Sequence, residues 1–196
     1  MIDSRKPEDA LTDAWLEGGP GAVAIARNVD RLLDAVRRHL DMDVAFVSEF
    51  HGSHRVFRHV VTRLDRAPIR PGDSRPLDEG YCMRVVEGSI PQLIPDTAAV
   101  PALECIPETQ RVPIGSHLSV PIQLRDGRVY GTFCCFSLAS NLSLGERDAE
   151  SASLACPVFT AGARFLGALG VVGPIGRFGA ASGSVAVRRS AGAGRA

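Results

Sequence analysis

The chain has 196 residues, of which 45% are hydrophobic, and it carries 22 acidic and 22 basic residues. This is the composition of an ordinary soluble protein, long enough for one domain of about 100–150 residues with extensions at its ends. Because the net charge is zero, no general attraction to nucleic acid or to an anionic membrane is expected, and we predict neither as a partner.

The charge is unevenly distributed along the chain. Residues 1–150 hold all 22 acidic residues against 17 basic ones, whereas residues 151–196 hold five arginines and no acid. The end of the chain is also rich in glycine, alanine and serine, a composition that cannot build a core, so we expect residues 157–196 to be a disordered tail. A shifted reading frame in a GC-rich gene would produce the same composition. Residues 1–20 are predicted to be a polar extension.

The five cysteines are an odd number without regular spacing, which favours free thiols in a reducing compartment over a disulfide framework. The first residues are charged and lack the apolar centre of a signal peptide. We therefore predict a cytoplasmic protein.

Residues 22–40 have apolar side chains three and four positions apart, with arginine and aspartate between them. This spacing predicts an amphipathic helix. Residues 44–50 and 55–62 are rich in the valine and phenylalanine that favour strands. Because the turn residues 51–54 separate them, we predict an antiparallel hairpin.

The middle of the chain is broken by proline. Residues 64–76 contain three prolines and are predicted to form a loop. Asp78 is a suitable cap for a short helix that runs to Val86 and ends at Gly88. Residues 90–94 are predicted to be extended. Residues 96–114 contain three further prolines, which leave room only for short helical turns.

The strongest strand pattern lies at residues 116–124 and 128–137, on either side of Asp126-Gly127. Asp-Gly between two apolar runs favours a tight hairpin turn. Residues 144–148 then indicate the start of a closing helix.

The segments YCMRVVEG, IPDT, SVPI and GRVYGTFCCFS lie between residues 81 and 137. Together they resemble the GAF domain, a small-molecule-sensing module of signalling proteins, and most of all the GAF domains that precede EAL or GGDEF output domains in bacteria. The resemblance covers about residues 23–150 and implies a domain over residues 21–156. It implies an α/β (α+β) fold with an antiparallel sheet of about five to six strands, helices on one face and a loop-covered pocket on the other.

The cavity between sheet and loops is the usual place for a ligand in such a fold. Asp96 has an alternative role as a loop cap, and Tyr81 as a buried ring with its hydroxyl bonded to the backbone. Side chains alternate between the two faces of a strand, and the sequence does not show which of the two sets faces the cavity. The candidate ligand-binding residues are Phe46, Ser48, Tyr81, Cys82, Asp96, Ser116, Leu118 and Val120.

Two cysteines suggest rival functions. Cys82 lies in a segment similar to that of a nucleophilic cysteine in the free methionine sulfoxide reductases, which have the GAF fold, and a helix N-terminus would lower its pKa. That family would require partner cysteines upstream, but no cysteine precedes Cys82 in this sequence. Cys105 is placed as in bilin-binding GAF domains, but Ile106 and Pro107 follow it instead of histidine. Cys134 and Cys135 point to opposite faces of a strand and are predicted to be small apolar fillers.

Phosphate-binding loops, dinucleotide fingerprints, kinase motifs and the pattern of cyclic-nucleotide-binding GAF domains are all missing from the sequence. We therefore predict a non-enzymatic sensor with no cofactor and no metal. An unknown small-molecule ligand or an oxidant would order residues 64–115. The terminal helices would form a homodimer and pass the change to a signalling output protein.

Overall fold

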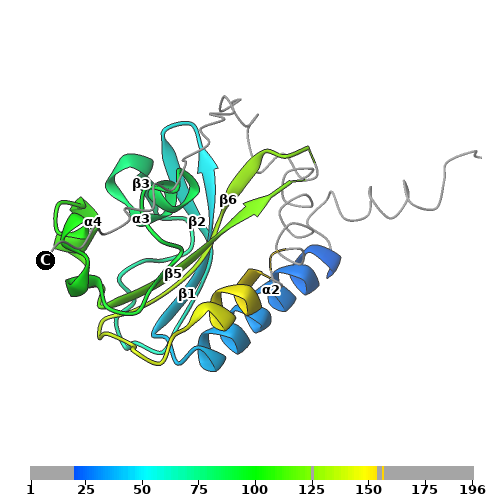
Figure 1. Ribbon diagram of the computed structural model, residues 1–196. Coiled ribbons are helices and arrows are strands. Elements are labelled where there is room, and N and C mark those ends of the chain that lie inside the picture. The colour runs from blue at the N-terminus through cyan, green and yellow to red at the C-terminus, as the bar shows by residue number, and fades with distance from the viewer. Residues whose placement is uncertain (1–19, 125, 154–155, 157–196) are drawn as a thin grey trace, which may run out of the picture.

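The computed structural model describes residues 20–124, 126–153 and 156 (Figure 1). Within them lies a six-stranded sheet in which every pairing is antiparallel. One face is covered by helix α2 (Pro20–His39) and by the helical residues 146–153, and the other face by residues 64–115. The predicted α+β fold is confirmed. The extension predicted over residues 1–20, apart from Pro20, and the tail predicted over 157–196 lie outside the described residues.

The sheet has the order β3-β2-β1-β6-β5-β4. Its centre is formed by two strands from opposite ends of the domain, which pair with each other and also with their hairpin partners. Both predicted hairpins are thus confirmed, and Gly127 adopts the positive φ of 80° that the second turn requires. The strands are β1 (Val44–His51), β2 (His54–Thr62), β3 (Ser74–Pro76), β4 (Leu93–Ile94), β5 (Ser116–Gln123) and β6 (Val129–Ser137).

The layer over the second face consists of short helices joined by loops. Pro101 and Pro107 each begin a helical turn, a position where proline loses no hydrogen bond. The predicted cap at Asp78 is wrong, because residues 77–79 form a separate turn and Gly80 precedes the helix without a side-chain cap. The elements are η1 (Leu77–Glu79), α3 (Tyr81–Val86), η2 (Thr97–Ala99), η3 (Pro101–Leu103) and α4 (Pro107–Arg111). Across the described ranges, no helix is long and apolar enough to cross a membrane.

The alternation of β1 separates two hydrophobic cores. Ala45 and Val47 point to the helix-covered face, whereas Val44 and Phe46 point to the loop-covered face. The loop-covered face is itself densely packed, because side chains from residues 64–115 meet those of the sheet there. It is therefore a second core, with Phe46 in edge-to-face contact with Phe57 at 5.1 Å between ring centroids.

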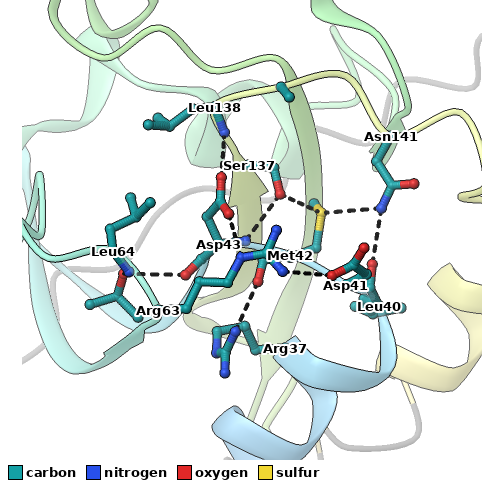
Figure 2. A network of polar contacts seen from close by, with 12 residues as sticks. Arg37, Leu40, Asp41, Met42, Asp43, Arg63, Leu64, Ser137, Leu138 and Asn141 are labelled. Carbon is teal, nitrogen blue, oxygen red and sulfur yellow. Dashed lines mark hydrogen bonds and ion pairs between the residues drawn. The ribbon is translucent and has the colours of Figure 1, made fainter.

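Asp43 lies between α2 and β1, at one end of the sheet, and joins three segments there (Figure 2). Its Oδ1 accepts a hydrogen bond from Arg63 Nε at 2.6 Å, and its Oδ2 accepts one from the backbone N–H of Leu138 at 2.8 Å. The Ser137 hydroxyl lies 3.0 Å from the Asp43 backbone nitrogen, which donates to it. These contacts fix the ends of β2 and β6 against the start of β1.

We predict that Asp43→Ala lowers the free energy of unfolding by about 2–3 kcal/mol, because it removes the charge-assisted hydrogen bonds that a buried carboxylate accepts from Arg63 and from the Leu138 N–H. Urea denaturation measures the change. Asp41→Asn is the matched control, because Asp41 adopts a left-handed φ of 48° that asparagine tolerates and alanine does not. Asp41 also pairs with Arg63, but its side chain is 79% exposed, so we expect a loss below about 1 kcal/mol. Equal losses in the two variants would contradict this role for Asp43.

Candidate functional site

The loop-covered face contains one buried guanidinium, that of Arg55 on β2, whose side chain is only 2% exposed. Its Nη1 donates to Cys82 Sγ at 3.0 Å, and its Nη2 forms an ion pair with Glu108 of α4. The group also lies 5.2 Å from the centre of the Phe57 ring. A charge removed from water is costly unless it is paired, so these contacts are what allow Arg55 to be buried.

Gly80 and Tyr81, at the start of α3, both lie close to the Arg55–Glu108 pair. A Cβ on Gly80 would lie 2.6 Å from Arg55 Cζ, so the absence of a side chain there leaves room for the cation. The second carboxylate oxygen of Glu108 accepts a hydrogen bond from the Tyr81 backbone N–H at 3.1 Å. Glu108 therefore holds both Arg55 and the first residue of α3.

Cys82 lies next to a second buried thiol. Its Sγ is 3.4 Å from Cys134 Sγ on β6, a residue 52 positions later in the chain. Cys134 in turn contacts the hydroxyls of Ser119 at 3.1 Å and Thr132 at 3.2 Å. Thr132 is also hydrogen-bonded to Ser48, at 3.0 Å. The result is a polar seam across the sheet, inside an otherwise apolar layer.

The two thiols have opposite acidities. The hydrogen bond with Cys134 and the positive charge of Arg55 lower the pKa of Cys82 to about 6, although burial opposes this shift. Burial and the neighbouring Cys82 raise the pKa of Cys134 well above its usual value. Of the two thiols, Cys82 is therefore the one that ionises first, with Cys134 as the neutral donor to it.

His117 and Tyr81 pack together beside this seam, with ring centroids 4.8 Å apart. Burial, assisted by the charge of Arg55, lowers the pKa of His117 to about 3, so its ring is neutral. Its Nδ1 has no hydrogen-bond partner within the described part of the chain. The Tyr81 hydroxyl is hydrogen-bonded to the Thr109 hydroxyl at 2.7 Å. Its partner is therefore a side chain, whereas the sequence alternative expected a backbone group.

A cleft of about 210 Å³ opens beside the Arg55–Glu108 pair. It contains three arginines against one glutamate, and Arg111 forms a further ion pair with Glu79. A second cleft, of about 620 Å³, lies between the β1–β2 turn and α3 and has lining residues of both charges. The smaller cleft is lined by Arg55, Pro68, Ile69, Arg75, Glu108, Arg111 and Val112.

The structure places the predicted site residues in three groups. Phe46, Ser48, Tyr81 and Cys82 are on the loop-covered face, and only Cys82 contacts Arg55 directly. Asp96 caps η2 by accepting a hydrogen bond from the Ala98 N–H at 3.1 Å, which is the alternative that the sequence left open.

The expected positions of Ser116, Leu118 and Val120 require correction. Leu118 and Val120 belong to the helix-side core, and the Ser116 hydroxyl contacts Met42 of the same core. Because side chains alternate along β5, the loop-covered face receives His117 and Ser119 instead.

Arg55 and Glu108 were not predicted as site residues. Arg55 has the same parity as the buried Phe57 on β2, and an arginine at a core position of a strand indicates a buried charge. Glu108 has no local signal, since it lies 53 positions from Arg55 in a proline-rich segment.

The sequence model of the GAF domain family matches residues 25–153. The chain therefore belongs to the GAF domain family, whose members generally serve as signalling or sensor domains. No curated protein matches the chain.

Solved structures share this fold at low identity. The GAF domain of an Acinetobacter phosphoenolpyruvate-protein phosphotransferase is 16% identical, with a TM-score of 0.59, and the match covers 83% of this chain and 98% of that one. The phycocyanobilin-bound GAF domain of a cyanobacterial phytochrome is also 16% identical, with a TM-score of 0.59 and coverages of 79% and 95%. A type II free methionine-R-sulfoxide reductase from Thermoplasma acidophilum is 14% identical, with a TM-score of 0.55 and coverages of 73% and 94%.

We predict that a pH titration of thiolate ultraviolet absorbance shows one transition at a pH of about 6 in the folded protein. Cys82→Ser removes this transition, and Arg55→Met moves it upward because the stabilising charge is lost. Cys135→Ser is the control, since burial raises the pKa of that thiol. A titration in which Cys82→Ser matches the wild type would contradict the assignment.

A second prediction concerns stability. Because folding lowers the pKa of Cys82 from 9.0 to about 6, the unfolded state binds more protons between these values. The stability contributed by the thiolate is therefore full above pH 9 and is lost as pH falls toward 6. We expect the free energy of unfolding of the wild type, relative to Cys82→Ser, to rise across this window in urea denaturation. A difference that does not change with pH would contradict the shift.

Proposed function

We propose that this GAF domain is a non-enzymatic sensor in a bacterial signalling protein, and that it binds a small anionic molecule in the cleft beside Arg55. The observation that carries the proposal is a buried guanidinium that lines a cleft together with Arg75 and Arg111. Such a planar cation pairs with carboxylate or phosphate through two parallel hydrogen bonds.

The size and charge of the cleft restrict the ligand class. Its volume of about 210 Å³ is below the range of about 300–1,000 Å³ that is typical of drug-sized ligands. A small carboxylate or a phosphate therefore suits it better than a nucleotide. Glu108 now supplies the anionic partner of Arg55, so the ligand would replace an internal carboxylate.

This replacement provides a route for signalling. Glu108 binds Arg55 and the backbone N–H of Tyr81 together. A ligand that takes its place on Arg55 releases both α4 and the start of α3, and so shifts the population of arrangements in residues 64–115. The response would be a rearrangement of the loop layer over a fixed sheet.

We also propose that the domain forms a homodimer in the cytoplasm. Its partner would be an output protein, such as one with an EAL or GGDEF domain. The outward side of α2 carries the exposed Arg27, Arg31 and Arg38. A homodimer through the terminal helices, as the sequence predicts, would bring these arginines close to its interface.

A thiol-dependent reductase is the second candidate function. It is favoured by the Cys82 thiolate and its Cys134 neighbour, which supplies the partner thiol that no residue before Cys82 provides. The discriminating assay is reduction of free methionine sulfoxide by the full chain with a dithiol as reductant. Wild type without activity, or Cys82→Ser with full activity, excludes this candidate.

The sensor proposal predicts that one or more members of a panel of small carboxylates and inorganic phosphate raise the melting temperature of the full chain. A ligand present at a hundred times its Kd adds about 2.7 kcal/mol of stability. Glu108→Gln frees Arg55 from its internal carboxylate, so we expect about tenfold tighter binding, equal to about 1.4 kcal/mol, by calorimetry.

Glu104→Gln is the matched control, because Glu104 is exposed on the same segment and we expect unchanged affinity. Arg55→Met should abolish binding. A panel with no thermal shift in either wild type or Glu108→Gln would refute the proposed ligand class.

A further inference from the structure

We propose that Cys82 and Cys134 form a reversible disulfide when a hydroperoxide reaches Cys82, which makes the domain a two-thiol redox centre. This function goes beyond the anion sensor and requires no anionic ligand. It rests on the placement of two buried thiols from different elements, α3 and β6, directly against each other.

The distance between the sulfurs is the first argument. They are 3.4 Å apart, and a disulfide bond of about 2.0 Å requires them to approach by about 1.4 Å. Cys134 is also held in position, because its sulfur contacts the hydroxyls of Ser119 at 3.1 Å and Thr132 at 3.2 Å. The pair is thus arranged for reaction before any oxidant arrives.

The surroundings assign a different role to each thiol. Arg55 Nη1 donates to Cys82 Sγ at 3.0 Å and stabilises the thiolate, which is the attacking form. No cationic side chain among the described residues is hydrogen-bonded to Cys134; it contacts hydroxyls and the other sulfur. Cys82 is therefore the nucleophile and Cys134 the resolving thiol.

The chemistry balances with hydrogen peroxide as the oxidant. The Cys82 thiolate attacks one peroxide oxygen and the O–O bond breaks, giving Cys82 sulfenic acid and a hydroxide that takes up a proton to become water. The sulfur of Cys134 then attacks Cys82 Sγ. The S–S bond forms, the S–O bond breaks, and the departing hydroxide takes the Cys134 proton as a second water. Two thiols lose two electrons, and one peroxide becomes two waters.

Burial restricts the oxidant to small molecules. Cys82 is 1% exposed, and the Arg55–Glu108 pair lies between its sulfur and the cleft of about 210 Å³. Hydrogen peroxide is small enough to enter through this cleft, whereas a peptide disulfide is not. We therefore expect an external dithiol to reduce the product slowly.

Two further cysteines serve as internal controls. Cys135 follows Cys134 but points into the helix-side core, where burial raises its pKa and suppresses the thiolate. Cys105 is exposed to solvent on the loop after η3. Exposure alone would favour oxidation of Cys105, whereas the geometry favours Cys82.

The test treats the full chain with hydrogen peroxide at equimolar ratio, blocks remaining thiols by alkylation after unfolding, and maps peptides by mass spectrometry. We expect a Cys82–Cys134 linked peptide as the main product, and its loss after dithiol treatment. Cys134→Ser should stop the reaction at the Cys82 sulfenic acid, which dimedone present during unfolding traps. Cys135→Ser and Cys105→Ser should leave the linked peptide unchanged.

The Arg55→Met variant tests whether Cys82 reacts because Arg55 stabilises its thiolate or only because Cys134 lies next to it. At neutral pH the thiolate fraction falls by about tenfold for each unit that the pKa rises above the pH, so the rate of peroxide consumption should fall about tenfold or more. A wild type in which Cys105 is oxidised while Cys82 and Cys134 remain reduced would overturn the proposal. So would an unchanged rate in Arg55→Met. These outcomes are independent of whether any anion binds, so the redox centre and the anion sensor can fail separately.

Discussion

The burial of one positive charge, that of Arg55, is the constraint on which the loop-covered face depends. A guanidinium in an apolar layer needs partners, and the two that it has come from α3 and α4. The glycine before α3 leaves the space that the guanidinium occupies. The carboxylate that neutralises it also holds the first N–H of α3. One ionic contact therefore connects the sheet to both short helices of the layer above it.

The two faces of the sheet have different chemistry for this reason. The helix-covered face is a largely apolar core closed by α2. Its buried charge is the Glu49 carboxylate, which accepts hydrogen bonds from Arg58 Nε at 2.6 Å and from the Tyr130 hydroxyl at 3.3 Å. The loop-covered face has an apolar core with a polar seam that runs from Glu108 through Arg55 and Cys82 to Cys134. Within the part of the chain that the structure describes, charge, a thiolate and a cleft occur together only along this seam, so both the proposed ligand site and the proposed redox centre lie there.

The sequence predicted most of the elements, although β3 (Ser74–Pro76) lies in the segment predicted to be a loop, and it did not predict the site. Periodicity and turn chemistry predicted α2, both hairpins and the proline-broken layer, because these depend on neighbours in the chain. The facing of β5 was not predictable, since SHLSVPIQ places Leu118, Val120 and Ile122 on one face but does not say whether helices or loops cover that face. Contacts such as Arg55 with Glu108 and Cys82 with Cys134 join residues about fifty positions apart, and only the sheet order brings them together.

The most direct test of the role of Arg55 compares amide hydrogen exchange, measured by mass spectrometry, between the wild-type full chain and the Arg55→Met variant. If the buried guanidinium holds the loop layer on the sheet, residues 77–112 exchange faster in the variant while β1 and β6 keep their protection. Unchanged protection over residues 77–112, or an equal loss over the whole sheet, would contradict the central role of Arg55.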